Sequence, residues 1–301
     1  MKNQIVSVII PCTDRVEGLD RCIMSALAQD CEAIIEVILI ENNSNDRSKI
    51  PLLIESINDE RIKHYYLELC ENANWARNYG VEVSSGGFIA YLDSDDWWGE
   101  FHIRNNLELM SNGAQALYSS YTIDNGKYRQ AKESYAIGQM SPYEFLFGKN
   151  CGVAQTSSFF LDKKVFDIVK WDEDLKRSQD YDFFIRVQKH IGWTYNHNSD
   201  VYVYWQEGMA RAISVPAFEM FLNKHESMMT ENERAQYLSE ISKALVETSK
   251  KDFLIFRKRL SPYFSCLALK DKLILMNYFS ASLYCNFRVQ YRRLKAKLRV
   301  S

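Results

Sequence analysis

Apolar runs alternate with amphipathic segments along the first hundred residues. The runs are short and rich in β-branched residues, which is typical of buried strands. The segments between them repeat apolar residues at helical spacing, as Leu19, Cys22, Ile23 and Ala26 do. The order expected here is strand 5–11, helix 16–29, strand 34–40, helix 50–57, strand 62–66, helix 73–83 and strand 88–92. Such alternation predicts an α/β fold with a mostly parallel, open sheet flanked by helices.

The pattern is less regular after residue 98 and becomes helical throughout from residue 216. Between these points it predicts helix 102–110, strands 116–123 and 128–135, a helix from 141, strand 157–161, helix 180–190 and strand 201–205. We therefore expect one domain over residues 1–215, in two halves of 1–98 and 99–215. A helical C-terminal extension is expected over residues 216–301.

Three strands of the first half run directly into polar turns. The strand at 5–11 leads to Thr13 and Asp14, the next leads to 41–46, and the strand at 88–92 leads to 93–96. Open α/β sheets bind ligands outside the carboxyl ends of their strands. These three turns are therefore expected to face one crevice.

The turn at 93–96 carries three carboxylates, those of Asp93, Asp95 and Asp96. Carboxylates this close repel one another unless a cation or a set of donors keeps them ionised. Oxygen ligands of this kind suit Mg²⁺ or Mn²⁺, which takes one or two protein carboxylates and leaves its other positions to water and phosphate. The other interpretation is a solvated acidic turn that caps a helix.

Composition narrows the class of protein. The chain has 301 residues, 47% of them hydrophobic, and a net charge of -2, so no global charge favours nucleic acid. Its seven cysteines include no C-x-x-C pair and its histidines have no zinc-ligand spacing, which predicts reduced thiols in a cytoplasmic protein. No apolar stretch reaches the roughly 18 residues of a membrane span, and the N-terminus does not have the pattern of a signal peptide.

Four segments in this order resemble glycosyltransferase family 2, whose members have the GT-A fold, and the resemblance covers about residues 5–207. The segments are Val8-Ile-Ile-Pro-Cys-Thr-Asp-Arg15, Glu41-Asn-Asn-Ser-Asn-Asp46, Asn74-Trp-Ala-Arg-Asn-Tyr-Gly80 and Tyr91-Leu-Asp-Ser-Asp-Asp96. They are similar to the family patterns V-I-I-P-x-Y-N, D-D-G-S-x-D, A-R-N-x-G and L-D-x-D-D. In the family such enzymes invert the anomeric centre of a nucleotide-sugar donor.

The resemblance implies that residues 1–98 bind the nucleotide sugar and residues 99–215 the acceptor. Glu41 stands where the family holds the nucleotide base, and Arg77 could add a fixed positive charge or orient Asp93. The implied metal is Mn²⁺ or Mg²⁺, held by Asp95 with Asp93, Asp96 and Glu207, which replaces a family histidine. The implied nucleotide-sugar residues are Pro11, Thr13, Asp14, Arg15, Glu41, Asn43, Arg77, Asp93 and Ser94.

A later segment, Trp171-Asp-Glu-Asp-Leu-Lys-Arg-Ser-Gln-Asp-Tyr-Asp-Phe-Phe-Ile-Arg186, is similar to the family's G-F-D-E-x-L-x-x-x-E-D-x-D. The similarity assigns Asp180 as the catalytic base, with Gln179 in place of the family's glutamate. Asp180 could also cap the helix that follows, and both roles can hold at once; Asp182 could equally be the cap. The implied acceptor-binding residues are Trp97, Trp98, Thr156, Ser157 and Gln179.

The resulting hypothesis is an inverting, metal-dependent hexosyltransferase of bacterial-type surface polysaccharide synthesis, such as capsule or lipopolysaccharide. Its donor would be a UDP-sugar and its acceptor a glycan or a lipid-linked oligosaccharide. The alternative is a catalytically degenerate protein that binds nucleotide sugars or glycans. A glycoside hydrolase is disfavoured, because its two carboxylates must flank a sugar and this cluster is too tight.

The C-terminal end is basic. Residues 288–300 contain six Lys or Arg and no acid, with apolar residues between them. A basic amphipathic helix binds anionic membrane surfaces, which predicts a peripheral location on the inner face of the cell membrane. The alternative is a helix that packs on the domain or on a second subunit in a homodimer.

Overall fold

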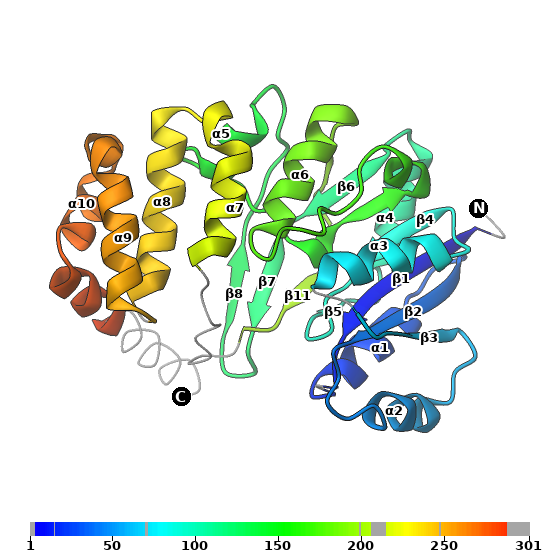
Figure 1. Cartoon of the computed structure of the whole chain (residues 1–301). Helices are drawn as coiled ribbons and strands as arrows, with labels where there is room; N and C mark the ends of the chain where they lie inside the picture. The colour runs from blue at the N-terminus through cyan, green and yellow to red at the C-terminus, as the bar shows by residue number, and fades with distance from the viewer. Residues whose placement is uncertain are drawn as a thin grey trace, which may run out of the picture. The chain divides into compact units, whose positions relative to one another are not determined.

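The computed structural model describes residues 4–14, 16–69, 72–198, 200–205, 215–246 and 248–287 (Figure 1). The chain forms two compact units. The first comprises Met1–Asn125, Arg129–Pro142 and Gly152–Trp205, and the second comprises Gly126–Tyr128, Tyr143–Cys151 and Gln206–Ser301. The predicted division into a catalytic domain over residues 1–215 and an extension over residues 216–301 stays a prediction.

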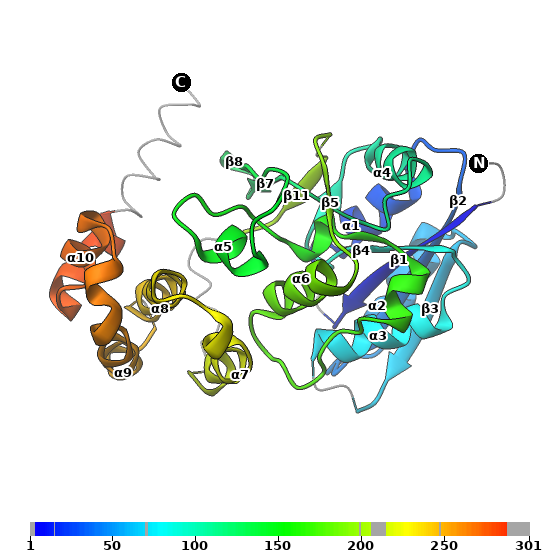
Figure 2. The same cartoon turned by 90° about the horizontal axis from the view of Figure 1, so that it is seen from above.

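The first unit is built on a seven-stranded sheet in the order β10-β6-β9-β4-β1-β2-β3 (Figures 1 and 2). Its strands are β1 (Ile5–Cys12), β2 (Ile34–Asn42), β3 (Ile62–Leu67), β4 (Phe88–Tyr91), β6 (Ala116–Ser119), β9 (Phe160–Asp162) and β10 (Thr194–Asn196). Neighbouring strands are parallel except where β9 pairs with β4 and β6. The predicted mostly parallel α/β sheet is confirmed, although β10 was not predicted.

Helices cover both faces of this sheet, because β1 is apolar on both of its sides. Val6, Val8 and Ile10 pack in one cluster with α1 (Leu19–Leu27) and α4 (His102–Ser111). On the other face α3 (Ala73–Val83) approaches so closely that a Cβ on Gly80 would lie 2.5 Å from Cγ2 of Ile9. Figure 2 shows α1 and α4 on one side of β1 and α3 and α6 (Gln179–His190) on the other.

A second, four-stranded sheet has the order β5-β11-β7-β8. Its strands are β5 (Trp97–Trp98), β11 (Val201–Val203), β7 (Tyr121–Asp124) and β8 (Arg129–Lys132). The prediction of one strand over 116–123 was wrong, because β6 and β7 belong to different sheets. The break is at Ser120, whose hydroxyl accepts the Ser134 N–H at 2.8 Å and bonds the Tyr195 hydroxyl at 2.7 Å.

The prediction of a strand from residue 157 also needs correction. Residues Thr156–Ser158 form a 3-10 turn (η1) before β9 begins. The Gln155 side chain caps this turn by accepting the Ser157 N–H at 2.5 Å. The remaining elements of this unit are α2 (Lys49–Ile57) and the 3-10 helix η2 (Lys163–Asp167).

The second unit is helical, as predicted. It contains α7 (Val215–His225), α8 (Glu231–Val246), α9 (Lys250–Leu260), α10 (Leu269–Leu275), the 3-10 helices η3 (Glu226–Met228) and η4 (Ser261–Cys266), and most of α5 (Pro142–Phe147). Phe147 of α5 packs against Phe221 and Tyr237, with ring centroids 6.2 and 5.1 Å away. Within the part of the chain that the structure describes, every helix is too short or too polar to span a bilayer.

A buried carboxylate ties the first two strands to the turn before β4. Glu36 of β2 accepts bonds from the Ser7 hydroxyl at 2.5 Å and from the N–H and hydroxyl of Ser85 at 2.9 and 2.8 Å, and it pairs with Lys63. Although burial by itself acts to raise the pKa of Glu36, the bonds from Lys63, Ser7 and Ser85 outweigh it and lower the pKa to about 2.

Replacing Glu36 by Gln is expected to lower the free energy of unfolding by about 1–3 kcal/mol at pH 7. Since the folded pKa is depressed, the carboxylate stabilises the fold fully above the ordinary pKa of 4.5 and loses that effect as pH falls toward about 2. The difference between wild type and Glu36→Gln should therefore shrink between about pH 5 and pH 2. Urea unfolding at several pH values measures it, with the exposed Glu32→Gln as control; equal losses in both variants would contradict the prediction.

Candidate active site

The acidic turn, residues 93–96, follows β4 and is hydrogen-bonded to the buried side chain of Ser157. The Ser157 hydroxyl donates to Oδ2 of Asp96 at 2.6 Å and accepts the Asp93 N–H at 3.0 Å. Asp96 is 1% exposed, and its other oxygen accepts the Tyr204 N–H at 2.9 Å. Burial, then the charges of Asp93 and Asp95, raise the pKa of Asp96. Asp96 and Ser157 therefore shape the turn from inside the protein.

Arg77 of α3 connects this turn to the beginning of α6. Its Nη2 donates to Oδ1 of Asp93 at 2.7 Å, and its Nη1 donates to Oδ1 of Asn74 at 3.0 Å and lies 3.5 Å from Oε1 of Gln179. The guanidinium is buried and stands 4.6 Å from the ring centre of Trp171. The Arg77 guanidinium thus contacts residues from both predicted halves of the domain, 1–98 and 99–215.

Asparagines of α3 hold the segment that precedes α6. Asn74 donates to the carbonyl of Asp172 at 2.6 Å, and Asn78 exchanges two bonds of 2.9 Å with the backbone of Trp171. Buried amides that bond backbone groups fix a loop that has no regular structure of its own. The sequence comparison of the A-R-N segment gave these two asparagines no role, and the structure makes them positioning residues.

Asp180 lies in the first turn of α6, with Ser178 at the N-cap position and in the left-handed region at φ 54°. Its Oδ1 accepts the neighbouring Tyr181 N–H at 3.0 Å, which is not the bond of a helix cap. The residue is partly exposed, but protein surrounds the carboxylate closely, and this burial raises the pKa of Asp180 to about 6. Asp93 also raises that pKa, whereas the Tyr181 N–H and Arg77 oppose the rise.

Tyr121 of β7 lies within electrostatic range of Asp180 and Asp96 and was not among the predicted site residues. Burial, then the negative charges of Asp180 and Asp96, raise the pKa of its phenol. Asp93, Asp180 and Tyr121 therefore meet in one region of the first unit. No local motif marks Tyr121, because its position near these carboxylates depends on how β7 pairs in the second sheet.

The two other polar turns also come together. Oδ2 of Asp14 accepts the N–H groups of Asn45 and Asp46 at 3.0 and 3.2 Å, which joins the turn after β1 to the turn after β2. Glu41 is buried, with Oε2 2.8 Å from Nε2 of His64. Its Oε1 is buried without a hydrogen-bond partner among the described residues.

Other predicted nucleotide-sugar residues lie around these turns. Pro11 is buried in β1, Thr13 and Asn43 are exposed, and Ser94 is partly exposed in the acidic turn. Asn43 is left-handed, at φ 52°. Arg15 lies outside the described residues.

The two predicted acceptor tryptophans differ in environment. Trp98 is buried, its indole N–H donates to the Ser157 carbonyl at 2.7 Å, and its ring stacks on His102 at 4.5 Å. Trp97 is partly exposed and stacks on Tyr202, and the guanidinium of Arg21 lies 3.5 Å from its ring centre. Thr156 is buried in η1 beside Ser157.

The comparisons decide to which family the chain belongs. Residues 7–169, more than half of the chain, match the family described as glycosyl transferase family 2. The chain belongs to this family. The amylovoran biosynthesis glycosyltransferase AmsB of Erwinia amylovora is 29% identical to it over 201 residues, which cover 63% of this chain and 65% of AmsB.

Another family 2 relative is the UDP-Glc:alpha-D-GlcNAc-diphosphoundecaprenol beta-1,3-glucosyltransferase WfgD of Escherichia coli, 32% identical over 158 residues. Those residues cover 51% of this chain and 58% of WfgD. The chain thus spans about three fifths of the curated relatives it matches. In structure, S. aureus TarS 1-349, solved with UDP-GlcNAc, superposes with a TM-score of 0.60 at 16% identity, over 97% of this chain and 92% of that one. This likeness identifies the GT-A fold.

The family 2 acidic turn can be tested for its fit to a divalent ion. No group of three or more His, Cys, Asp or Glu side chains within the described ranges is arranged around a common point, and Glu207 lies outside those ranges. Asp96 already accepts bonds at both oxygens, while Asp93 and Asp95 are partly exposed on the turn. One or two carboxylates are the protein ligand set that Mg²⁺ takes together with substrate phosphates. The turn fits such a set.

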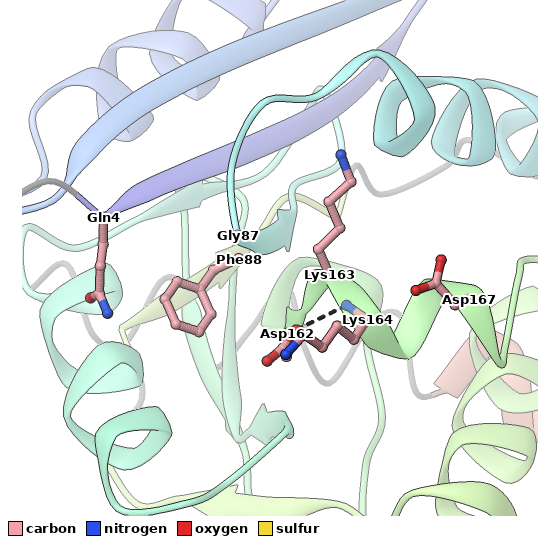
Figure 3. A pocket seen from close by; sticks show the side chains of 7 residues that line it. All are labelled: Gln4, Gly87, Phe88, Asp162, Lys163, Lys164 and Asp167. Atoms are coloured by element: carbon pink, nitrogen blue, oxygen red, sulfur yellow. Dashed lines mark hydrogen bonds between the residues drawn. The ribbon is translucent and has the colours of Figure 1, made fainter.

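A cavity of about 520 Å³ lies elsewhere on the sheet, lined by Gln4, Gly87, Phe88, Asp162, Lys163, Lys164 and Asp167 (Figure 3). Gln4 immediately precedes β1 and Phe88 begins β4, so this cavity is at the amino ends of the strands. The acidic turn is at their carboxyl ends. The cavity is therefore separate from the site of this family 2 domain.

The charges around Asp180 predict opposite effects of two substitutions. Asp93→Asn should lower the pKa of Asp180 below about 6, and Arg77→Met should raise it, because one change removes a negative neighbour and the other a positive one. Carboxyl-carbon NMR titration in metal-free buffer measures both, with Asp180→Asn to assign the resonance. Arg77→Lys keeps the charge and serves as control; shifts of the same sign in the first two variants would refute this electrostatic account.

Proposed function

We propose that this chain is an inverting, metal-dependent glycosyltransferase that moves a sugar from a nucleoside diphosphate donor to a glycan or lipid-linked acceptor. The observation that carries the proposal is the link through Arg77 between the acidic turn and the first turn of α6, where Asp180 has a pKa of about 6. A carboxylate with a raised pKa beside a second carboxylate that is paired to a cation is typical of a functional site, and it offers one group to accept a proton and another to bind an ion.

In the proposed reaction Asp180 is the catalytic base. With a pKa of about 6 it is ionised at pH 7 and still basic enough to take the proton of an acceptor hydroxyl. The hydroxyl oxygen forms a bond to the anomeric carbon as the bond from that carbon to the diphosphate oxygen breaks, and the electron pair leaves with the diphosphate. A single displacement inverts the anomeric centre, so an α-linked donor gives a β-linked product.

The proposed donor is a UDP-sugar. The unpartnered Oε1 of Glu41 supports this, because a buried acceptor without a partner fits the N–H of a pyrimidine base. Asp14 keeps the adjoining turns together through the N–H groups of Asn45 and Asp46. The TarS structure contains UDP-GlcNAc and WfgD uses UDP-Glc, and we extend only the shared UDP to this chain.

We propose that Asp95 and Asp93 hold the Mg²⁺ or Mn²⁺ ion, with Asp96 shaping the turn beneath them and Glu207 as a further ligand. When bound, the ion would neutralise charge on the departing diphosphate. Arg77 keeps Asp93 oriented toward this role through its 2.7 Å bond. Of the two tryptophans only Trp97 is partly exposed, so we propose it rather than the buried Trp98 as an acceptor contact. Since Tyr202 stacks on its ring and Arg21 lies 3.5 Å from the ring centre, the contact would use the exposed edge of the indole.

The proposed setting is bacterial surface polysaccharide synthesis at the inner face of the cell membrane. AmsB is by name a glycosyltransferase of amylovoran biosynthesis, and WfgD acts on a diphosphoundecaprenol-linked sugar. An acceptor of that class is a lipid-linked saccharide, and its lipid would keep the reaction at a membrane.

Asp180→Asn is expected to lower kcat by roughly 10²- to 10⁴-fold while donor binding is kept, because the base is lost and the shape is not. In the wild type, kcat should be constant above about pH 6 and fall below it, as Asp180 becomes protonated. Release of UDP in the presence of acceptor measures turnover, and the exposed Asp174→Asn is the matched control. Donor binding with no turnover in the wild type under any condition would instead indicate a binding protein.

Removing divalent ions with a chelator should abolish UDP release, and Mn²⁺ or Mg²⁺ should restore it. Asp95→Asn should lower kcat by roughly 10²-fold or more even at saturating metal, because the ion would lose a charged ligand. Isothermal titration of UDP with and without Mn²⁺ gives an independent readout of the same site. Full turnover in the chelator, with Asp95→Asn equal to Asp174→Asn, would rule out a metal-dependent mechanism.

A further inference from the structure

The last described helices of the second unit expose a row of large apolar side chains. The row begins in α10 and continues through the helical residues 278–287, which are red at the end of the coloured ribbon in Figure 1. A turn at residues 276–277 separates the two helices, and within each helix the exposed members are four positions apart, the spacing of one helix face. They are Leu269 (72% exposed), Leu273 (58%), Met276 (60%), Phe279 (77%), Leu283 (61%) and Phe287 (67%). We call these six residues the apolar row.

The apolar row is not the packing face of these helices. Ile274, Leu275, Ala281 and Cys285 are buried on the inner side, and Tyr278 packs on Phe253 of α9 with ring centroids 5.5 Å apart. The helices are therefore already anchored to their unit, with a second apolar face left to solvent. Soluble monomers rarely expose contiguous apolar patches of this kind, and where they do the patch usually binds a partner or a membrane.

Charge is concentrated in the same part of the sequence. Residues 248–301 contain thirteen Lys or Arg and two Asp, a net charge of +11, so the rest of the chain has a net charge of -13. Six of these basic residues belong to 288–301, outside the described residues, and others, such as Lys258 and Lys270, are exposed on α9 and α10. Apolar residues on one helix face with many cations around them are typical of helices that lie in a membrane interface.

We propose that the apolar row is a membrane-binding face that inserts into the surface of an anionic bilayer. Phe279, Leu283 and Phe287 would enter the boundary between headgroups and acyl chains, and the surrounding Lys and Arg would contact lipid phosphates. No described helix can span a bilayer, so the face would rest on the membrane rather than cross it. The face goes beyond the proposed chemistry and would place this protein where a lipid-linked acceptor is found.

Charge favours a lipid surface over a second copy of the chain. Two copies that met through this face would bring two regions of net charge +11 together, and like charges oppose such contact. An anionic bilayer supplies both an apolar interior and opposite charge. Nucleic acid would match the charge but would leave the phenylalanines and leucines in water.

Vesicle sedimentation of the full chain tests the proposal, without donor or acceptor. The vesicles are phosphatidylcholine alone or with about a third phosphatidylglycerol. We expect binding to the anionic vesicles that weakens with added salt, and roughly tenfold or greater loss of affinity in Phe279→Ser/Leu283→Ser/Phe287→Ser. The control is Leu52→Ser in α2, which removes a side chain of similar exposure, 61%, from the first unit. If the triple variant does not fold by circular dichroism, Phe279→Ser alone takes its place.

Two results would overturn the proposal. One is equal binding of the control and the apolar-row variant to anionic vesicles. The other is a wild type that is dimeric by light scattering and does not bind vesicles, together with an apolar-row variant that is monomeric. That result would assign the face to contact with a second copy of the chain. Since this assay does not measure turnover, its failure would leave the proposed reaction standing and bear only on its membrane setting, and loss of Asp180-dependent turnover would not affect the membrane face.

Discussion

The pairing of buried Arg77 with Asp93 is the interaction on which the site depends. An arginine in the interior needs a carboxylate and further acceptors, and here these come from the acidic turn, from α3 itself and from Gln179 at the start of α6. Because one guanidinium satisfies groups from separate segments, none of them can move independently. The same cation opposes the pKa rise that burial imposes on Asp180, so position and acidity are set together.

The sheet supplies the rigid frame for this arrangement. Ser7 of β1 and Ser85 each donate to Glu36 of β2, and Gly80 lets α3 lie directly on Ile9. With α3 fixed to the sheet, Asn74 and Asn78 hold the segment 171–175 by its backbone. The position of Asp180 thus follows from packing at the centre of the first unit.

The second unit has a different physical character. Its core is aromatic, around Phe147, Phe221 and Tyr237, and its last helices bury one face while exposing another. Acidic residues prevail in the remainder of the chain and basic residues in its last fifth. A protein with this asymmetry is oriented by an anionic surface before any short-range contact forms.

The sequence alone determined the alternation of strands and helices, the three polar turns at strand ends, the family resemblance and the candidate roles of Asp95 and Asp180, because strand periodicity and short motifs are local properties. Only the tertiary structure decided that Asp96 and Ser157 support the turn from within and that Trp98 belongs to the core. It also revealed Asn74, Asn78 and Tyr121, and it divided residues 116–123 between two sheets. These features depend on contacts between segments up to a hundred residues apart, and burial and hydrogen-bond partners at that separation cannot be deduced from residue type or spacing.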